Sequence, residues 1–207
     1  MNIEVINTYN DNFELIGRCD YDTVHKTGLW HQVIHCWIIE RTTRSIVYQK
    51  RSENKSIYPN LLDVSVAGHC REFETPEVAL EREAFEELGL AIDTNKLNKI
   101  GIRRDSFAVG DRINREFQHI FFYETELTAN GVTIDNNELQ YIVLVKPDDV
   151  IKSLKEQTSV EAIKLINNTL SQTMISYKEF IPSLDNYNVK IPLAISKYLI
   201  GERQFYF

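Results

Sequence analysis

The sequence predicts an α/β (α+β) fold with a mixed β-sheet and helices on both sides of it. Apolar stretches with the composition of β-strands alternate along the chain with stretches of helical period. Of the 207 residues, 43% are hydrophobic and 26% are charged, an ordinary composition for a globular protein. This length suffices for one domain with a core and an elaboration but is short for two full domains. We therefore expect a single domain over residues 1–207.

The strands expected before the main helix are short and separated by turn residues. Two β-like runs near the start, divided by Asn and Asp residues, predict an N-terminal hairpin laid over the main fold. Two longer strands, a polar loop and a short strand that ends at a glycine follow. The expected ranges are 3–6 and 13–17 for the hairpin and 31–40, 45–51 and 61–67 for the later strands.

The clearest helix follows Thr75 and ends before Gly89. Thr75 can cap its first turn, and Pro76 suits the first helical position, where a missing N–H costs nothing. Gly89 can adopt the left-handed conformation that often closes a helix. Apolar residues at helical spacing predict a face that packs on a core: Val78, Leu80, Ala84, Phe85 and Leu88.

The second half of the chain continues the alternation of strands and helices. Further strands are expected over residues 100–107, 115–127 and 140–145. Further helices are expected over residues 147–155, 159–170 and 191–200.

Three carboxylates occupy one side of the main helix. Glu83, Glu86 and Glu87 are spaced i, i+3 and i+4, so their side chains share a face. Like charges one turn apart repel, and carboxylates late in a helix oppose its dipole. A solvated acidic face would relieve this repulsion cheaply. The alternative is a cluster of hard oxygen ligands for Mg²⁺ or Mn²⁺, with substrate phosphates filling the remaining positions.

Nine residues in and around this helix favour the metal site, because together they resemble the Nudix box. The matching positions are Gly68, Glu74, Arg82, Glu83, Ala84, Glu86, Glu87, Gly89 and Leu90. Ala84 is small where a larger aliphatic residue is usual. The resemblance implies a Nudix-type α/β/α sandwich with a core at about residues 30–157. It leaves an N-terminal β extension over 1–29 and a C-terminal helical extension over 158–207.

The resemblance also implies roles for the residues of the box. Glu83 and Glu87 would be the principal ligands of Mg²⁺ or Mn²⁺, and Glu86 a further ligand or a water-positioning group. Arg82 and Glu74 would form a structural ion pair that braces the loop against the helix.

A second set of residues resembles the branch of Nudix proteins that is related to isopentenyl-diphosphate isomerase. These residues are His25, Gly28, His31, Gln49, Lys50, Arg51, Ser52, Lys55, Tyr58, Pro59, Gly68 and His69. In that branch the residues that match Arg51 and Lys55 grip a diphosphate, and two cations four positions apart suit that task. The alternative is that both are solvated loop charges.

The histidines of this set point to an accessory metal or phosphate site. In the isomerases, His25, His31 and His69 would help to hold a metal ion, together with a glutamate from a later strand. Glu116 is the best candidate for that glutamate, because a carboxylate that heads an apolar strand needs a partner or a function. The alternative for each histidine is a hydrogen-bonded structural role.

One departure separates two possible chemistries. The isomerase uses a cysteine directly before the Gly-His pair, where this chain has Ala67. Cys70 lies on the other side of the glycine turn, and we do not expect it to reach the same position. Loss of the thiol removes the acid–base chemistry of the isomerase, whereas the full set of glutamates favours hydrolysis.

We therefore expect a metal-dependent pyrophosphohydrolase that cleaves the diphosphate linkage of a nucleoside or other X-linked diphosphate. A glutamate must accept the proton of the attacking water, and Glu86 and Glu116 are both candidates. An isopentenyl-diphosphate-isomerase-like enzyme is one alternative. A non-catalytic module that senses a nucleotide or a diphosphate is another.

Charge and targeting signals restrict the partners. The net charge of -7 argues against a nucleic-acid polymer or an anionic membrane as a partner. The first residues lack the features of a signal peptide, and no apolar run approaches the roughly 20 residues of a membrane span. Cys19, Cys36 and Cys70 show no CxxC spacing, which favours reduced thiols in a cytoplasmic protein. We expect a monomer or homodimer acting on a small-molecule diphosphate.

Overall fold

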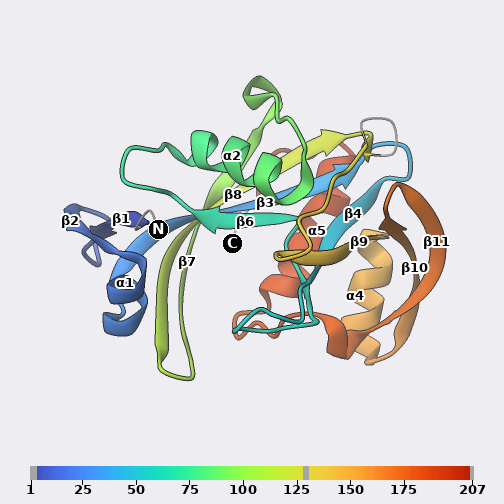
Figure 1. The fold of residues 1–207 in the computed structure, drawn as a ribbon. Helices are drawn as coiled ribbons and strands as arrows, with labels where there is room; N and C mark the ends of the chain where they lie inside the picture. Colours follow the sequence, from blue (N-terminus) through green and yellow to red (C-terminus); the bar gives the residue numbers. More distant parts are fainter. Residues whose placement is uncertain (1–3, 128–130, 206–207) are drawn as a thin grey trace.

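Figure 1 shows the fold of the protein in a computed structural model that describes residues 4–127 and 131–205. Within these residues, eleven strands form one mixed sheet. The strands are β1 (Val5–Tyr9), β2 (Leu15–Asp20), β3 (Trp30–Glu40), β4 (Ser45–Arg51), β5 (Leu62–Asp63), β6 (Val66–His69), β7 (Asn98–Val109), β8 (Arg112–Thr125), β9 (Leu139–Val145), β10 (Ser159–Ile166) and β11 (Thr169–Ser176).

Helices cover both faces of the sheet (Figure 1). They are α1 (Tyr21–Thr27), α2 (Pro76–Leu88), α4 (Pro147–Glu156) and α5 (Tyr187–Leu199), with short 3-10 helices at Thr94–Lys96 and Tyr177–Glu179. Leu80 and Leu88 of α2 pack with Ile34 in one buried cluster, and Ile191 of α5 packs with Trp37 in the other. The α/β prediction, with helices on both sides of a mixed sheet, is therefore confirmed.

Strand β3 is the centre of the sheet. Strand β8 pairs with it in parallel from Trp30↔Arg115 to Glu40↔Thr125. On its other edge β3 pairs in succession with β1, β6 and β4, all antiparallel. Because side chains alternate between the faces of a strand, the even-numbered Ile34 faces α2 while the odd-numbered Trp37 faces α5. This arrangement brings Gly68 of β6 and the first residues of β8 to opposite edges of β3.

The prediction of a helix over residues 159–170 is wrong. This segment forms the hairpin of β10 and β11, which extends the sheet beyond β9. Val160, Ala162 and Leu165 are buried and the residues between them are more exposed, which is close to the period of a strand. Asn167 and Asn168 both have positive φ, 48° and 58°, as a two-residue hairpin turn requires. The C-terminal extension is thus a hairpin followed by α5, and the helix expected at 191–200 is confirmed within α5.

The N-terminal extension also differs in part from the prediction. The expected hairpin exists as β1 and β2, although residue 3 lies outside the described residues. Instead of lying over the fold, it joins the sheet through the pairing of β1 with β3. Helix α1, which was not predicted, follows the hairpin; its N-terminus is capped by Asp20 and it ends at Gly28 in the left-handed conformation.

Candidate active site

Helix α2 has the ends that its sequence predicts. The Thr75 side chain accepts a hydrogen bond from the backbone N–H of Val78, and Pro76 occupies the first turn. Gly89 has a φ of 62° and donates its N–H to Phe85 O at 3.0 Å. These ends fix the register of the helix, and therefore the direction of its carboxylates.

Arg82 joins the helix to the loop that precedes it. Its Nε donates to Glu74 Oε1 at 2.6 Å and its Nη2 to Glu74 Oε2 at 2.8 Å, a bidentate pair. Nη2 also donates to the carbonyl of His69 at 3.0 Å. Although burial opposes the effect, the hydrogen bonds from Arg82 hold the pKa of Glu74 below its usual range. The side chains expected to brace the loop against the helix are therefore in contact.

Glu83 lies directly against the backbone of β6. A Cβ atom added to Gly68 would collide with the Glu83 carboxylate, so only glycine permits this approach. Glu83 Oε1 is also 2.6 Å from Arg82 Nη1. Burial raises the pKa of Glu83 to about 7, against the lowering effect of Arg82.

Glu87 points into the protein. The residue is only 5% exposed, and its Oε2 contacts no hydrogen-bond donor among the described residues. Burial, and then the charges of Glu83, Glu138 and Asp63, raise the pKa of Glu87 well above its usual range. A buried acceptor without a donor, surrounded by further carboxylates, is an environment that a hard divalent cation fits.

Glu86 is the most exposed of the three helix carboxylates. It accepts a hydrogen bond from Arg82 Nη1 at 3.1 Å and lies 3.8 Å from Arg71 Nη2. Glu83 and Glu86 thus both contact Arg82, while Glu87 faces inward and has no cationic partner in hydrogen-bond range among the residues that the structure describes.

The two cations expected to bind diphosphate are already paired with carboxylates. Arg51 Nη1 donates to Asp63 Oδ2 at 2.8 Å, and Lys55 Nζ contacts Glu138. Both basic side chains are partly buried. The same two carboxylates act on the pKa of Glu87, so Arg51 and Lys55 border the carboxylate end of α2.

Sequence reasoning missed Asp63 and Glu138. Asp63 lies in the two-residue strand β5, and Glu138 ends the loop before β9. Two backbone hydrogen bonds hold that loop on the end of α2, from Thr133 N to Leu88 O and from Asp135 N to Glu87 O. Neither residue belongs to a local motif, so only the folded chain reveals their position.

The three histidines meet as expected. The ligand nitrogens of His25, His31 and His69 lie within 4.8 Å of one another, and elsewhere in residues 4–127 and 131–205 no three His, Cys, Asp or Glu side chains do so. His25 Nδ1 lies 2.9 Å from Tyr21 O and His31 Nδ1 2.9 Å from Leu29 O, so these nitrogens carry the protons.

The Nε2 atoms of His25 and His31 therefore carry lone pairs, and His25 Nε2 lies 3.3 Å from His69 Nε2. Burial lowers the pKa of His31 to about 4, which keeps it neutral. Neutral imidazoles oriented by carbonyl acceptors are the form in which histidine binds a metal.

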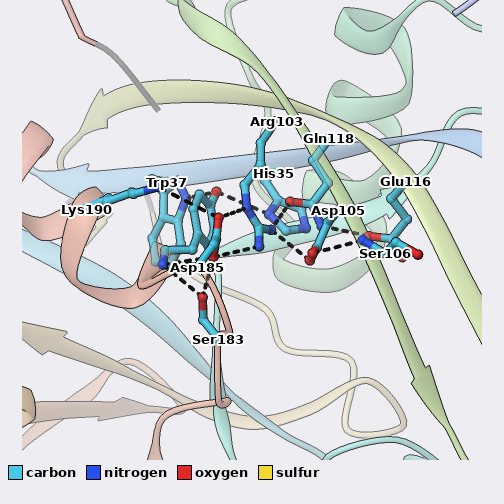
Figure 2. A network of polar contacts seen from close by, with 11 residues as sticks. His35, Trp37, Arg103, Asp105, Ser106, Glu116, Gln118, Ser183, Asp185 and Lys190 are labelled. Atoms are coloured by element: carbon cyan, nitrogen blue, oxygen red, sulfur yellow. Dashed lines mark hydrogen bonds and ion pairs between the residues drawn. The ribbon is translucent and has the colours of Figure 1, made fainter. Parts of the chain in front are cut away.

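Glu116 lies next to this group without joining it. It pairs in register with His31 across β8 and β3, but its Oε2 accepts a hydrogen bond from Gln118 Nε2 at 2.7 Å. Gln118 Oε1 in turn accepts from Arg103, which forms a bidentate pair with Asp185 (Figure 2). Burial raises the pKa of Glu116 to about 7. Glu116 is thus connected to the segment before α5 rather than to the carboxylates of α2.

The thiol of Cys70 does not take the place of the isomerase cysteine, whose position in this chain is occupied by Ala67. Cys70 is buried in the cluster under α2, whereas Ala67 packs against the cluster under α5. Burial raises the pKa of Cys70 to about 12, so the group is an inert thiol.

Two surface cavities lie away from these residues. One, of about 460 Å³, is lined by Arg41, Arg44 and Arg203, and the other, of about 500 Å³, lies between Leu154 and Phe180. Within the described part of the chain, no helix has the length and apolar character needed to cross a membrane.

Comparison with known proteins identifies the family of this site. The model of the NUDIX domain matches residues 29–167. The chain belongs to the Nudix family. It is 35% identical over 156 residues to an uncharacterized Nudix hydrolase of Clostridium acetobutylicum, a match that covers 74% of this chain and 75% of the relative. It is accordingly an enzyme of the Nudix hydrolase class, which acts on diphosphate bonds.

Two further similarities are informative. A prenyl-diphosphate phosphatase of Methanosarcina mazei is 27% identical over 152 residues, covering 71% of this chain and 87% of that protein. The crystal structure of DR0079 from Deinococcus radiodurans superposes with a TM-score of 0.55 at 22% identity, over 74% of this chain and 90% of the other. The latter supports the Nudix fold of the chain.

Proposed function

We propose that this Nudix hydrolase is a metal-dependent pyrophosphohydrolase that cleaves the diphosphate linkage of a nucleoside or other X-linked diphosphate. The observation that carries the proposal is the buried Glu87 carboxylate, whose Oε2 has no donor and whose neighbours are further carboxylates. Such a group is costly unless a cation joins it. The cation required is Mg²⁺ or Mn²⁺, because the ligands are carboxylate oxygens.

Glu83, Glu86 and Glu87 would hold this ion, with Glu83 kept against β6 by the absence of a side chain at Gly68. When bound, the ion offsets the charge of the phosphate oxygens and lowers the pKa of the attacking water. To hold the ion, Glu83 and Glu86 would have to give up their contacts with Arg82, while Arg82 would keep its bidentate pair with Glu74.

Arg51 and Lys55 would orient the diphosphate. Each is preoriented by a carboxylate, Asp63 or Glu138, and phosphate oxygens can replace those partners. The exchange leaves the basic side chains in place and frees two carboxylates beside Glu87.

A glutamate must accept the proton of the attacking water, and we keep Glu86 and Glu116 as candidates. The pKa of about 7 that burial gives Glu116 suits a general base at neutral pH. Glu86 has the advantage of lying on α2 beside the other carboxylates.

The alternative function is that of an isopentenyl-diphosphate-isomerase-like enzyme. The convergence of His25, His31 and His69, with Glu116 in the next strand, favours it and supports an accessory metal site. Ala67, where that chemistry needs a thiol, opposes it.

We further propose that the substrate is a small molecule rather than a nucleic-acid polymer, because the net charge is -7. A cytoplasmic location and a monomeric or homodimeric state complete the proposal. Size-exclusion chromatography with light scattering tests the last point, and a larger assembly would contradict it.

The test of the function is release of phosphate or nucleotide from a panel of diphosphates with Mg²⁺, Mn²⁺ or EDTA. The panel includes isopentenyl diphosphate, with isomerisation followed in parallel. We expect cleavage of at least one compound with metal and none with EDTA. Isomerisation without hydrolysis would support the alternative enzyme, and ligand-induced stabilisation without turnover would support a sensing module.

A further inference from the structure

A histidine that sequence reasoning did not select borders the proposed site. His35 of β3 pairs in register with Ala67 of β6, the residue directly before Gly68. Residues paired across antiparallel strands have their side chains on one face with Cβ atoms about 5 Å apart. His35 and Ala67 both remain partly exposed, although they belong to the middle of the sheet.

Asp63 connects this position to the diphosphate-binding residues. It holds Arg51, and its charge acts on the pKa of Glu87, of His35 and of Tyr187. Asp63 is therefore close both to Glu87 of α2 and to His35. Arg51, which would hold the diphosphate, and His35 thus share Asp63 as a neighbour.

The hydrogen-bond partners of His35 determine where its proton lies. Trp37 Nε1, which can only donate, contacts the hydroxyl of Tyr187 at 3.0 Å. That hydroxyl is 3.3 Å from His35 Nδ1 and is left to donate its own proton there. His35 Nδ1 is then an acceptor, so the proton of the neutral ring is on Nε2. Burial lowers the pKa of His35 to about 4, which keeps the ring in this neutral form.

The Nε2–H of His35 is available to a ligand. Among residues 4–127 and 131–205 nothing accepts its hydrogen bond, yet it is absent from the fully buried polar atoms that lack partners, a set that includes His31 Nε2. It therefore keeps access to solvent. The contact of Nδ1 with the Tyr187 hydroxyl of α5 holds the ring that carries this donor in one orientation.

The surroundings of this donor are polar and fixed. Arg103 donates to Asp185 and Gln118, lies 2.9 Å from Asp105, and stacks over the ring of Tyr187 at 4.3 Å. Figure 2 shows His35 and Trp37 beside this network, with Glu116 at its other end. The groups of this network pair with one another, and none of them accepts a hydrogen bond from His35 Nε2.

We propose that His35 is a specificity-determining residue whose Nε2–H donates to an oxygen of X, so that X is a hydroxyl-bearing group such as a ribose or a hexose and not a prenyl chain. This inference rests on the proposed hydrolysis of an X-linked diphosphate. An all-carbon chain would bury the donor without an acceptor, whereas a sugar supplies several acceptor oxygens.

The test compares kcat/KM for ADP-ribose, UDP-glucose and geranyl diphosphate. The variants are His35→Leu, which removes the donor, His35→Gln, which restores an N–H, and Tyr187→Phe, which removes the group that sets the tautomer. The wild type should prefer a sugar-bearing compound. His35→Leu should lower kcat/KM for that compound by about 10- to 100-fold and spare geranyl diphosphate. His35→Gln should recover part of the loss, and Tyr187→Phe should show an intermediate loss.

His119→Leu is the matched control. His119 is a buried histidine whose pKa is also lowered to about 4, but it pairs in register with Ile34 and so lies on the α2 face of the sheet. His119→Leu should lower the stability of the protein without changing the ratio of kcat/KM for a sugar-bearing compound to kcat/KM for geranyl diphosphate.

Binding of ADP-ribose and geranyl diphosphate by calorimetry separates this inference from the proposed function. Hydrolysis with an unchanged substrate ratio in His35→Leu, or a wild-type preference for geranyl diphosphate, would overturn the role of His35 and leave the hydrolase intact. Absence of hydrolysis with His35-dependent ADP-ribose binding would reject the hydrolase and support the role of His35. Absence of both would reject both.

Discussion

Glu87 illustrates how the chemistry of this protein depends on single atoms. Its carboxylate lies in the interior, where burial and neighbouring acidic groups raise its pKa. Without a cation the buried group destabilises the fold, because nothing in the described residues donates to Oε2. Because no donor occupies this buried oxygen, Glu87 Oε2 can bind a divalent cation strongly. Stability and function therefore make opposite demands on this residue.

Replacing Glu87 with Gln should separate these demands. We expect the metal-free Glu87→Gln variant to be more stable than the wild type by about 1–3 kcal/mol, because the amide carries no charge that must be buried. Metal-dependent turnover should fall by about 100-fold or more. Denaturant unfolding with EDTA and steady-state kinetics measure the two effects. Glu81→Gln, at an exposed position of the same helix, is the control, and full turnover in Glu87→Gln would refute the ligand assignment.

The site also requires that position 68 has no side chain. A methyl group at this position would meet the Glu83 carboxylate, so Gly68→Ala should push that side chain out of place. A displacement of about 1 Å at a catalytic group lowers rates by about 100-fold, and we expect a loss of that order in kcat/KM. Gly101→Ala is the matched control, because a Cβ there meets no atom within 4 Å. Equal kinetics in the two variants would argue against the close approach.

Among the helices and strands, the features that depend on residues close together in the chain were predicted correctly. The caps and the carboxylate face of α2 depend on residues a few positions apart, and the structure contains them. Contacts between segments far apart in the chain were not predictable, and those of Asp63, Glu138 and His35 belong to this class. The hairpin of β10 and β11 was mistaken for a helix because Val160, Ile163 and Ile166 also fit a helical spacing. The two asparagines of its turn, both at positive φ, are the feature of the sequence that distinguishes this hairpin from a helix.

The turn of this hairpin gives a test of its own. Asn168 has a φ of 58°, and its Oδ1 accepts the N–H of Val132 at 3.0 Å. Asn168→Ala should destabilise the protein by about 1–2 kcal/mol, because alanine tolerates neither the conformation nor the loss of the acceptor. Asn168→Gly should lose less stability, because glycine adopts a positive φ without strain. Thermal or urea unfolding measures both, and a harmless Asn168→Ala would mean that the turn contributes little.

In the molecule as a whole, buried histidines and buried glutamates make the free energy of unfolding depend on pH in opposite directions. Burial lowers the pKa of His31, His35 and His119 to about 4, and it raises the pKa of Glu83 and Glu116 to about 7. The histidines cost stability as the pH falls below 6.5, because only the unfolded chain then binds their protons. The glutamates cost stability as the pH rises from 4.5 toward 7, because only the folded chain then keeps theirs.

His119 allows one of these contributions to be isolated. Its folded pKa of about 4 lies below its ordinary value of 6.5, so its contribution is intact above pH 6.5 and is lost as the pH falls toward 4. The loss is at most about 1.4 kcal/mol for each unit of pKa shift. His119→Gln should therefore cost less stability at pH 4.5 than at pH 7.5, measured by urea unfolding. A difference that grows on acidification would show that the ring binds its proton in the folded state.

The central ladder constrains the order in which the chain can be assembled. Strand β3 is almost entirely buried, yet its pairing with the parallel strand β8 begins only at Arg115, which is synthesised after α2 and the whole box. A growing chain must therefore carry β3 with one edge unpaired until β8 emerges. Contacts between such distant segments close slowly. In pulse-labelling hydrogen exchange we expect amides of the β7–β8 hairpin to gain protection before those that join β3 to β8, so that Glu116 takes its place beside His31 only in the later step.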